Sequence, residues 1–180
     1  DVQYIGVGGT PAELVTALQQ GKIDAAAVWE PILTRVLRDK SAYVLLSSAD
    51  PQQNRQWWGT DRIQDLGLIT REDLIKSKPE MLKGVVAATR RALDFIRNQP
   101  PERIADVVLA HPKGKEWWGN LDRDVIIGST TTAKGLLGDG CMSPPSFETL
   151  MNLLVEYKIA KKRISFNEYA DTRWAGTCPQ

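Results

Sequence analysis

The sequence has no hydrophobic run long enough to cross a membrane and no run of five or more like charges. A membrane-spanning helix needs about 20 consecutive apolar residues. The 23 basic and 22 acidic residues give a formal net charge of +1, whereas nucleic-acid-binding domains usually carry a clustered basic face. The densest basic stretch, residues 161–163, fits a solvated surface better than a docking patch. We therefore expect neither a membrane span nor a nucleic-acid partner.

Cysteine and histidine are also scarce. Cys141 and Cys178 are the only cysteines, and His111 is the only histidine. A zinc site takes about four ligands, commonly Cys and His, and these residues are too few and too far apart to supply them. A Ser-His-Asp triad would have to use His111, and nothing near it resembles a nucleophile elbow. We expect no metal, no cofactor and no enzymatic activity.

What is present is the composition of an ordinary folded domain, with 42% hydrophobic and 25% charged residues. Short apolar segments at residues 2–7, 23–29 and 43–46 are typical of strands. Between the first two, Thr10, Pro11 and Glu13 form a capping-box pattern that begins a helix, and Gly21 ends it. Pro31 begins the next helix. The alternation predicts a parallel, or mostly parallel, α/β sheet.

The character of the chain changes after residue 46. Residues 47–61 are polar and typical of a loop, and residues 66–69 form a short apolar crossing segment. The longest predicted helix covers residues 79–98, with one apolar face made by Leu82, Val85, Val86, Thr89, Leu93 and Ile96. Further helices are predicted over 102–110 and from 146 onward, while residues 123–137 fit a helix or a strand.

Several segments resemble the nitrate/sulfonate/taurine family of periplasmic binding proteins, which includes binders of thiamine precursors. The resemblance lies in ALQQGKIDA at residues 17–25, followed by Trp29, Glu30 and Pro31. It continues through residues 68–75 and 78–82, the helix at 87–93 and the segment 100–102. It is closest over residues 3–110 and holds only in outline over 111–180.

The resemblance implies a type II periplasmic-binding-protein fold, with two hinged α/β lobes that hold a ligand between them. Matched to that fold, residues 1–62 form part of the second lobe, and residues 63–180 form the returning hinge and the helices that complete the first lobe. We therefore expect an incomplete fold whose sequence begins inside a lobe. Because exposed strand edges find partners, self-association through those edges is possible.

The function implied by the resemblance is extracytoplasmic: the capture of a small anionic or aromatic solute and its delivery to the membrane permease of an ABC importer. We expect a periplasmic location. Two alternatives remain open at this stage. One is a ligand-sensing domain of a regulator or receptor. The other is an enzyme similar to the related pyrimidine synthases, which is disfavoured because those enzymes use a histidine and a cysteine cluster.

Candidate ligand-binding residues lie where predicted strands end. Trp29 and Glu30 follow the second strand, at the edge where open α/β sheets bind ligands, although Glu30 also fits a helix cap and Trp29 a core position. Gly9 and Thr10 follow the first strand and could hold an anionic group through backbone N–H groups, or form only a turn and a cap.

Aromatic pairs are the last candidates. Trp57 and Trp58 could supply an aromatic wall to a ligand or anchor a loop, and Trp117–Trp118 is a similar pair. Cys141 and Cys178 both lie in loop-like sequence. In the oxidising compartment that the resemblance implies, we expect them to form a disulfide.

Overall fold

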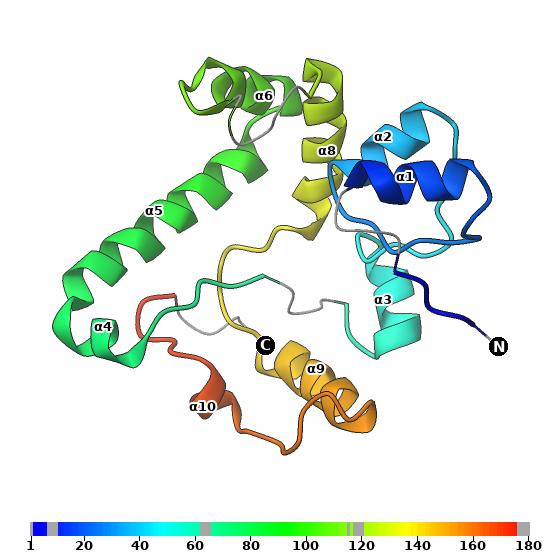
Figure 1. Cartoon of the computed structure of the whole chain (residues 1–180). Coiled ribbons are helices and arrows are strands. Elements are labelled where there is room, and N and C mark those ends of the chain that lie inside the picture. Colours follow the sequence, from blue (N-terminus) through cyan, green and yellow to red (C-terminus); the bar gives the residue numbers. More distant parts are fainter. Residues whose placement is uncertain (1, 7–10, 62–65, 115, 117–120, 176–180) are drawn as a thin grey trace. The chain divides into compact units, whose positions relative to one another are not determined.

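The computed structural model describes residues 2–6, 11–61, 66–114, 116 and 121–175. Nine helices lie within these residues, and Figure 1 labels them. They are α1 (Pro11–Gln19), α2 (Ile32–Arg38), α3 (Pro51–Trp58), α4 (Glu72–Ser77), α5 (Pro79–Asn98), α6 (Pro101–Ala110), α8 (Arg123–Leu136), α9 (Pro144–Glu156) and α10 (Phe166–Tyr169). The chain divides into two compact units, one of residues 1–45 and 100–133, the other of residues 46–99 and 134–180.

The first unit has its core where α1, α2, α6 and most of α8 bring apolar side chains together. Two ion pairs support it: Arg38 to Asp122 at 3.0 Å, and Arg123 to Asp106 at 2.8 Å, which joins α8 to α6. The buried apolar residues of this core are Ala17, Ile32, Val36, Ile104, Ala105, Val125 and Ile126.

A close approach between α2 and α8 depends on Gly128. A Cβ atom at this position would lie 2.6 Å from the Thr34 methyl carbon. We expect Gly128→Ala to lower the free energy of unfolding by about 1–2 kcal/mol, because the clash outweighs the better helix propensity of alanine. The double variant Gly128→Ala with Thr34→Ser, which lacks that methyl, should recover most of the loss in urea denaturation. A Gly128→Ala protein as stable as the parent would contradict this contact.

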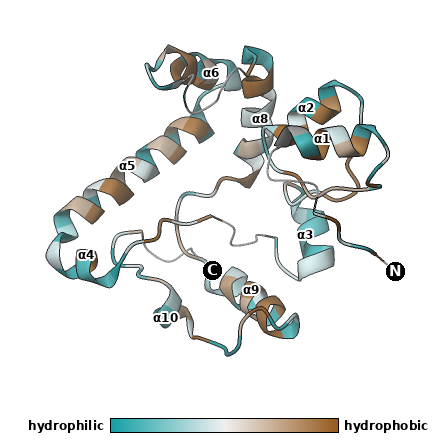
Figure 2. Ribbon diagram, viewed as in Figure 1, coloured by the Kyte–Doolittle hydropathy of each residue, from teal (hydrophilic) through white to brown (hydrophobic). Residues whose placement is uncertain are grey.

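The second unit contains α3, α4, α5, α9, α10 and the last residues of α8. Helix α5 covers the predicted residues 79–98, and its predicted apolar face is half-buried except for Val85. Hydrophobic and hydrophilic residues alternate along this helix in Figure 2. The best-buried apolar residues of the unit are Phe147 and Met151 on α9. Predictions of helices at 102–110 and 146 onward are confirmed, and the ambiguous segment 123–137 is a helix.

The predicted strands are not found, because the described residues contain no β-strand. Residues 2–6, 23–28 and 42–46 run without a helix, and no backbone hydrogen bond between described residues uses them. Their apolar side chains are largely exposed: Tyr4 is 97% exposed and Tyr43 81%. A strand needs a neighbour that accepts and donates its backbone hydrogen bonds, and the described residues supply none. The α/β architecture is therefore not confirmed by the structure.

The prediction of a loop over residues 47–61 is wrong, since α3 occupies Pro51–Trp58. Asp50 caps the helix by accepting hydrogen bonds from the N–H groups of Gln52 and Gln53, and Pro51 occupies its first turn. Gly59, at φ 71°, ends it in the left-handed conformation that glycine adopts without strain. The signals for a helix were present in the sequence, but the many polar residues between them suggested a loop.

Candidate functional site

Trp29 and Glu30 lie where an extended apolar segment enters α2. The Trp29 carbonyl accepts hydrogen bonds from the N–H groups of Ile32 (3.0 Å) and Leu33 (3.3 Å), so the backbone is fixed here. The Trp29 side chain is nevertheless 72% exposed. It is therefore not a core residue in the structure, and its indole is available to stack on a flat partner.

Only one of the two carboxylate oxygens of Glu30 accepts a hydrogen bond among the described residues. Its Oε2 accepts a hydrogen bond from the backbone N–H of Thr34 at 3.1 Å, as a residue at a helix entry would. Its Oε1 is buried and has no hydrogen-bond partner among the described residues. A buried carboxylate oxygen without a donor is costly. The donor that satisfies it has to come from a neighbouring group or from a bound molecule.

This geometry changes the chemistry expected at the start of α2. The sequence suggested that N–H groups here could hold an anion, but Glu30 itself occupies the Thr34 N–H. A second negative charge would be repelled by this carboxylate. The arrangement favours a partner that carries N–H or O–H donors.

Trp57 and Trp58 lie on α3, in the second unit, whereas Trp29 belongs to the first. Successive residues of a helix are about 100° apart around its axis, so the two rings do not share one face. Trp57 is exposed and Trp58 is half-buried. Trp57 is therefore the more accessible of the two rings, and a ligand-binding role for either one stays a prediction.

Three predicted features fall outside the described residues: the Gly9–Thr10 turn with its capping box, the Trp117–Trp118 pair, and Cys178. Their roles stay predictions. Cys141 is described and is not a free thiol. The His111 ring accepts a hydrogen bond from the backbone N–H of Lys113 at 3.1 Å through Nδ1, in keeping with a loop residue.

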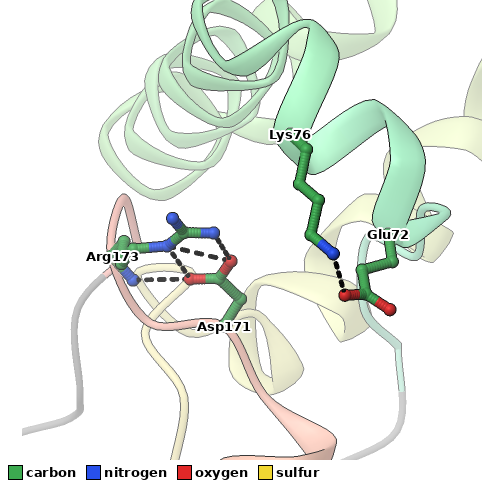
Figure 3. A network of polar contacts seen from close by, with 4 residues as sticks. All are labelled: Glu72, Lys76, Asp171 and Arg173. Carbon is green, nitrogen blue, oxygen red and sulfur yellow. Dashed lines mark hydrogen bonds and ion pairs between the residues drawn. The ribbon is translucent and has the colours of Figure 1, made fainter.

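Two ion pairs that sequence reasoning missed, one within α4 and one between Asp171 and Arg173, line the same hollow (Figure 3). The Lys76 Nζ lies 2.6 Å from Glu72 Oε1, and the Arg173 guanidinium makes a two-pronged contact with Asp171. The four side chains line a hollow of about 550 Å³. The i,i+4 spacing of Glu72 and Lys76 predicts an ion pair on a helix. The sequence does not indicate that Asp171 and Arg173, far away along the chain, line the same hollow.

Hydrogen bonds within the two ion pairs lower the pKa of both carboxylic acids, Asp171 and Glu72. The hydrogen bond from Arg173 lowers the pKa of Asp171, and that from Lys76 lowers the pKa of Glu72. A lowered pKa in the folded state stabilises the protein above the ordinary pKa of the acid, and this stabilisation is lost as the pH falls through the folded-state value. Because the side chains are mostly exposed, the effect is small.

Two kinds of site are absent from the part of the chain that the structure describes. No group of three or more His, Cys, Asp or Glu residues there could hold a metal ion. Among the same residues, no helix combines the length and the apolar character needed to cross a membrane.

Comparison with known proteins identifies the family to which the chain belongs. A family model described as NMT1/THI5 like matches residues 1–103. The chain belongs to this family, which confirms the resemblance to the nitrate/sulfonate/taurine binding proteins and implies a periplasmic-binding-protein-like fold. Trp29 and Glu30 lie within the matched residues.

Curated relatives point the same way. Proteins named as binding proteins in Brucella abortus (strain 2308) and Brucella suis biovar 1 (strain 1330) are each 26% identical to the chain over 137 residues. These matches cover 76% of this chain and 40% of each relative, so the chain spans less than half the length of the relatives. No solved structure matches the chain.

Proposed function

We propose that this protein is the extracytoplasmic solute-binding component of an ABC importer, which captures a small solute in the periplasm and delivers it to the membrane permease. The family match and the relatives named as binding proteins support a solute-binding role. The observation that carries the proposal is that the matched residues contain, next to each other in sequence, an exposed Trp29 and a Glu30 whose Oε1 lacks a donor.

The solute class follows from these two side chains. Of the two classes expected from the sequence, the aromatic one suits the site better than the anionic one. An exposed indole offers a flat apolar surface, while Glu30 Oε1, which is buried in the free chain, would accept an N–H or O–H donor once a local rearrangement exposes it to the solute. We propose a flat solute that carries at least one such donor. We expect the protein to release this solute without changing it chemically.

The experiment that tests this function is a binding screen on the full-length protein. Nucleobases, aminopyrimidines, aromatic amines, nitrate, sulfonates and carboxylates are titrated by calorimetry, and bound material is identified by native mass spectrometry. We expect one flat donor-bearing solute at a 1:1 ratio, recovered unaltered. Binding of simple anions alone would contradict the solute class, and recovery of an altered product would contradict the binding role.

The exposed extended segments fit the proposed fold. We propose that residues 2–7, 23–29 and 43–46 are strands of an incomplete second lobe within residues 1–62, and that residues 63–180 form the returning hinge and the helices that complete the first lobe. Exposed apolar strands seek partners, so we expect the 180-residue chain alone to self-associate. Sedimentation velocity at about 50 μM should show dimers or larger species. A single monomeric species with full solute affinity would contradict both the domain assignment and the self-association.

We also propose the disulfide between Cys141 and Cys178. Cross-linking would close a loop of 38 residues (178 − 141 + 1, with both cysteines included) and add roughly 4 kcal/mol of stability by chain-entropy reasoning. Thiol titration of the denatured, unreduced protein should find no free thiol per chain. Two free thiols would contradict the bridge. A change from monomer to covalent dimer on non-reducing gels would instead reveal an intermolecular link.

A further inference from the structure

Beside α9, in the second unit, lies a cavity of about 330 Å³, outside the residues that the family model matches. This volume falls within the range of small-molecule pockets. Its lining is almost entirely apolar, and the described residues that form it include one charged side chain, Lys162. The main apolar contributors are Phe147, Leu150, Met151, Leu154, Ile164 and Tyr169.

The inner wall of the cavity is a fixed aromatic cluster. Phe147 is 2% exposed, and its ring stacks on that of Tyr169 with centroids 4.8 Å apart. The Phe166 ring meets Phe147 edge-on at 5.7 Å. Ser165 caps α10 through a reciprocal capping box with Glu168, which holds Phe166 and Tyr169 in place. The apolar surface is therefore preformed.

The outer wall is the segment after α9, which is attached to that helix at two points. The Leu154 carbonyl accepts hydrogen bonds from the N–H groups of Ile159 and Ala160, both at 2.8 Å. Arg163 donates to the side chains of Asn152 and Glu148 at 2.5 and 2.6 Å. These contacts keep the segment from collapsing into the cavity.

Lys162 places a positive charge at this apolar space. Among the described residues it has no ion-pair partner within 4 Å. The positive charge of Lys162 acts on the nearby Glu168 carboxylate. The pKa of Glu168 is lowered mainly by hydrogen bonds from Ser165 and to a smaller degree by the charge of Lys162. Lys162 makes no ion pair with Glu168, so the ammonium group remains available to an anion, although the nearby Glu168 carboxylate reduces its attraction.

We propose that this cavity binds an amphiphilic monocarboxylate, whose apolar chain fills the space beside Phe147 and whose carboxylate meets Lys162. The site is separate from the proposed solute site and does not depend on it. Charge complementarity chooses this ligand over a neutral or cationic amphiphile of the same length.

The test is calorimetric titration of the full-length protein with decanoate, decanol and decylammonium. We expect decanoate to bind most tightly and decylammonium least. Lys162→Gln should weaken decanoate binding about fivefold, as for an exposed ion pair of roughly 1 kcal/mol. The matched control Lys161→Gln removes the neighbouring charge and should have no effect.

Filling the cavity gives an independent readout. Leu154→Trp or Leu150→Trp should abolish decanoate binding, and circular dichroism shows which variant keeps its helices. The proposal is overturned if both folded variants bind decanoate as the parent does. It is equally overturned if Lys162→Gln and Lys161→Gln have equal effects, or if decylammonium binds as well as decanoate.

Discussion

Replacing Phe147 by alanine is expected to lower the free energy of unfolding by about 3–5 kcal/mol. The side chain is 2% exposed and contacts two aromatic rings, and it is one of the two buried apolar residues among the described residues of the second unit. Its removal leaves a void that α9 and α10 cannot fill without losing the stacking on Tyr169. Guanidinium denaturation followed by circular dichroism measures the change.

A matched control for this substitution is Tyr157→Ala, which removes an aromatic ring that is 69% exposed just after the same helix. We expect a change within about 0.5 kcal/mol, as for most surface substitutions. A loss below 1 kcal/mol for Phe147→Ala would show that α9 and α10 do not form a packed core.

The second large effect is expected in solute binding. Trp29→Ala should weaken the affinity of the full-length protein at least thirtyfold, since aromatic anchors of binding sites contribute about 2 kcal/mol or more. Trp29→Phe keeps a flat ring and should retain most of the affinity. Calorimetry with the solute found in the screen measures both.

The stability of the fold should not change with these variants, because the Trp29 side chain is largely exposed. Tyr157→Ala again serves as the control, since it removes an exposed ring outside the family-matched residues. Equal solute affinities of the Trp29→Ala and Tyr157→Ala proteins would show that Trp29 does not contribute to the solute site.

Helices such as α1, α5, α6 and α9 were predictable because their signals are local, whereas α3 was missed and α8 was ambiguous. Pro79 and Pro100 bracket α5, and apolar residues recur every three or four positions between them. Helix α1 was likewise predicted by Pro11 and Gly21. A helix satisfies its backbone hydrogen bonds within one segment, so the sequence of that segment is enough to reveal it.

The strands were not predictable in the same way. Residues such as Tyr4 and Tyr43 have the apolar pattern of strands, but pairing depends on a neighbour that can be distant in sequence or belong to another chain. The apolar pattern therefore indicates only that these segments can form strands when a pairing partner is present. Their exposure in the structure is the physical sign that the described residues do not satisfy them.

The candidate site was predictable in part. The position of Trp29 and Glu30 before a helix could be inferred from sequence, and the structure places them there. The sequence could not show which Glu30 oxygen accepts a hydrogen bond and which one lacks a donor, because this depends on the contact with Thr34 and on burial. That detail moved the expected solute from an anion toward a hydrogen-bond donor.

The most direct test of the central claim is a structure of the full-length protein with its solute bound. The account predicts that the solute stacks on Trp29 and donates a hydrogen bond to Glu30 Oε1 at about 2.7–3.2 Å. A bound structure in which both side chains lie away from the solute would contradict it.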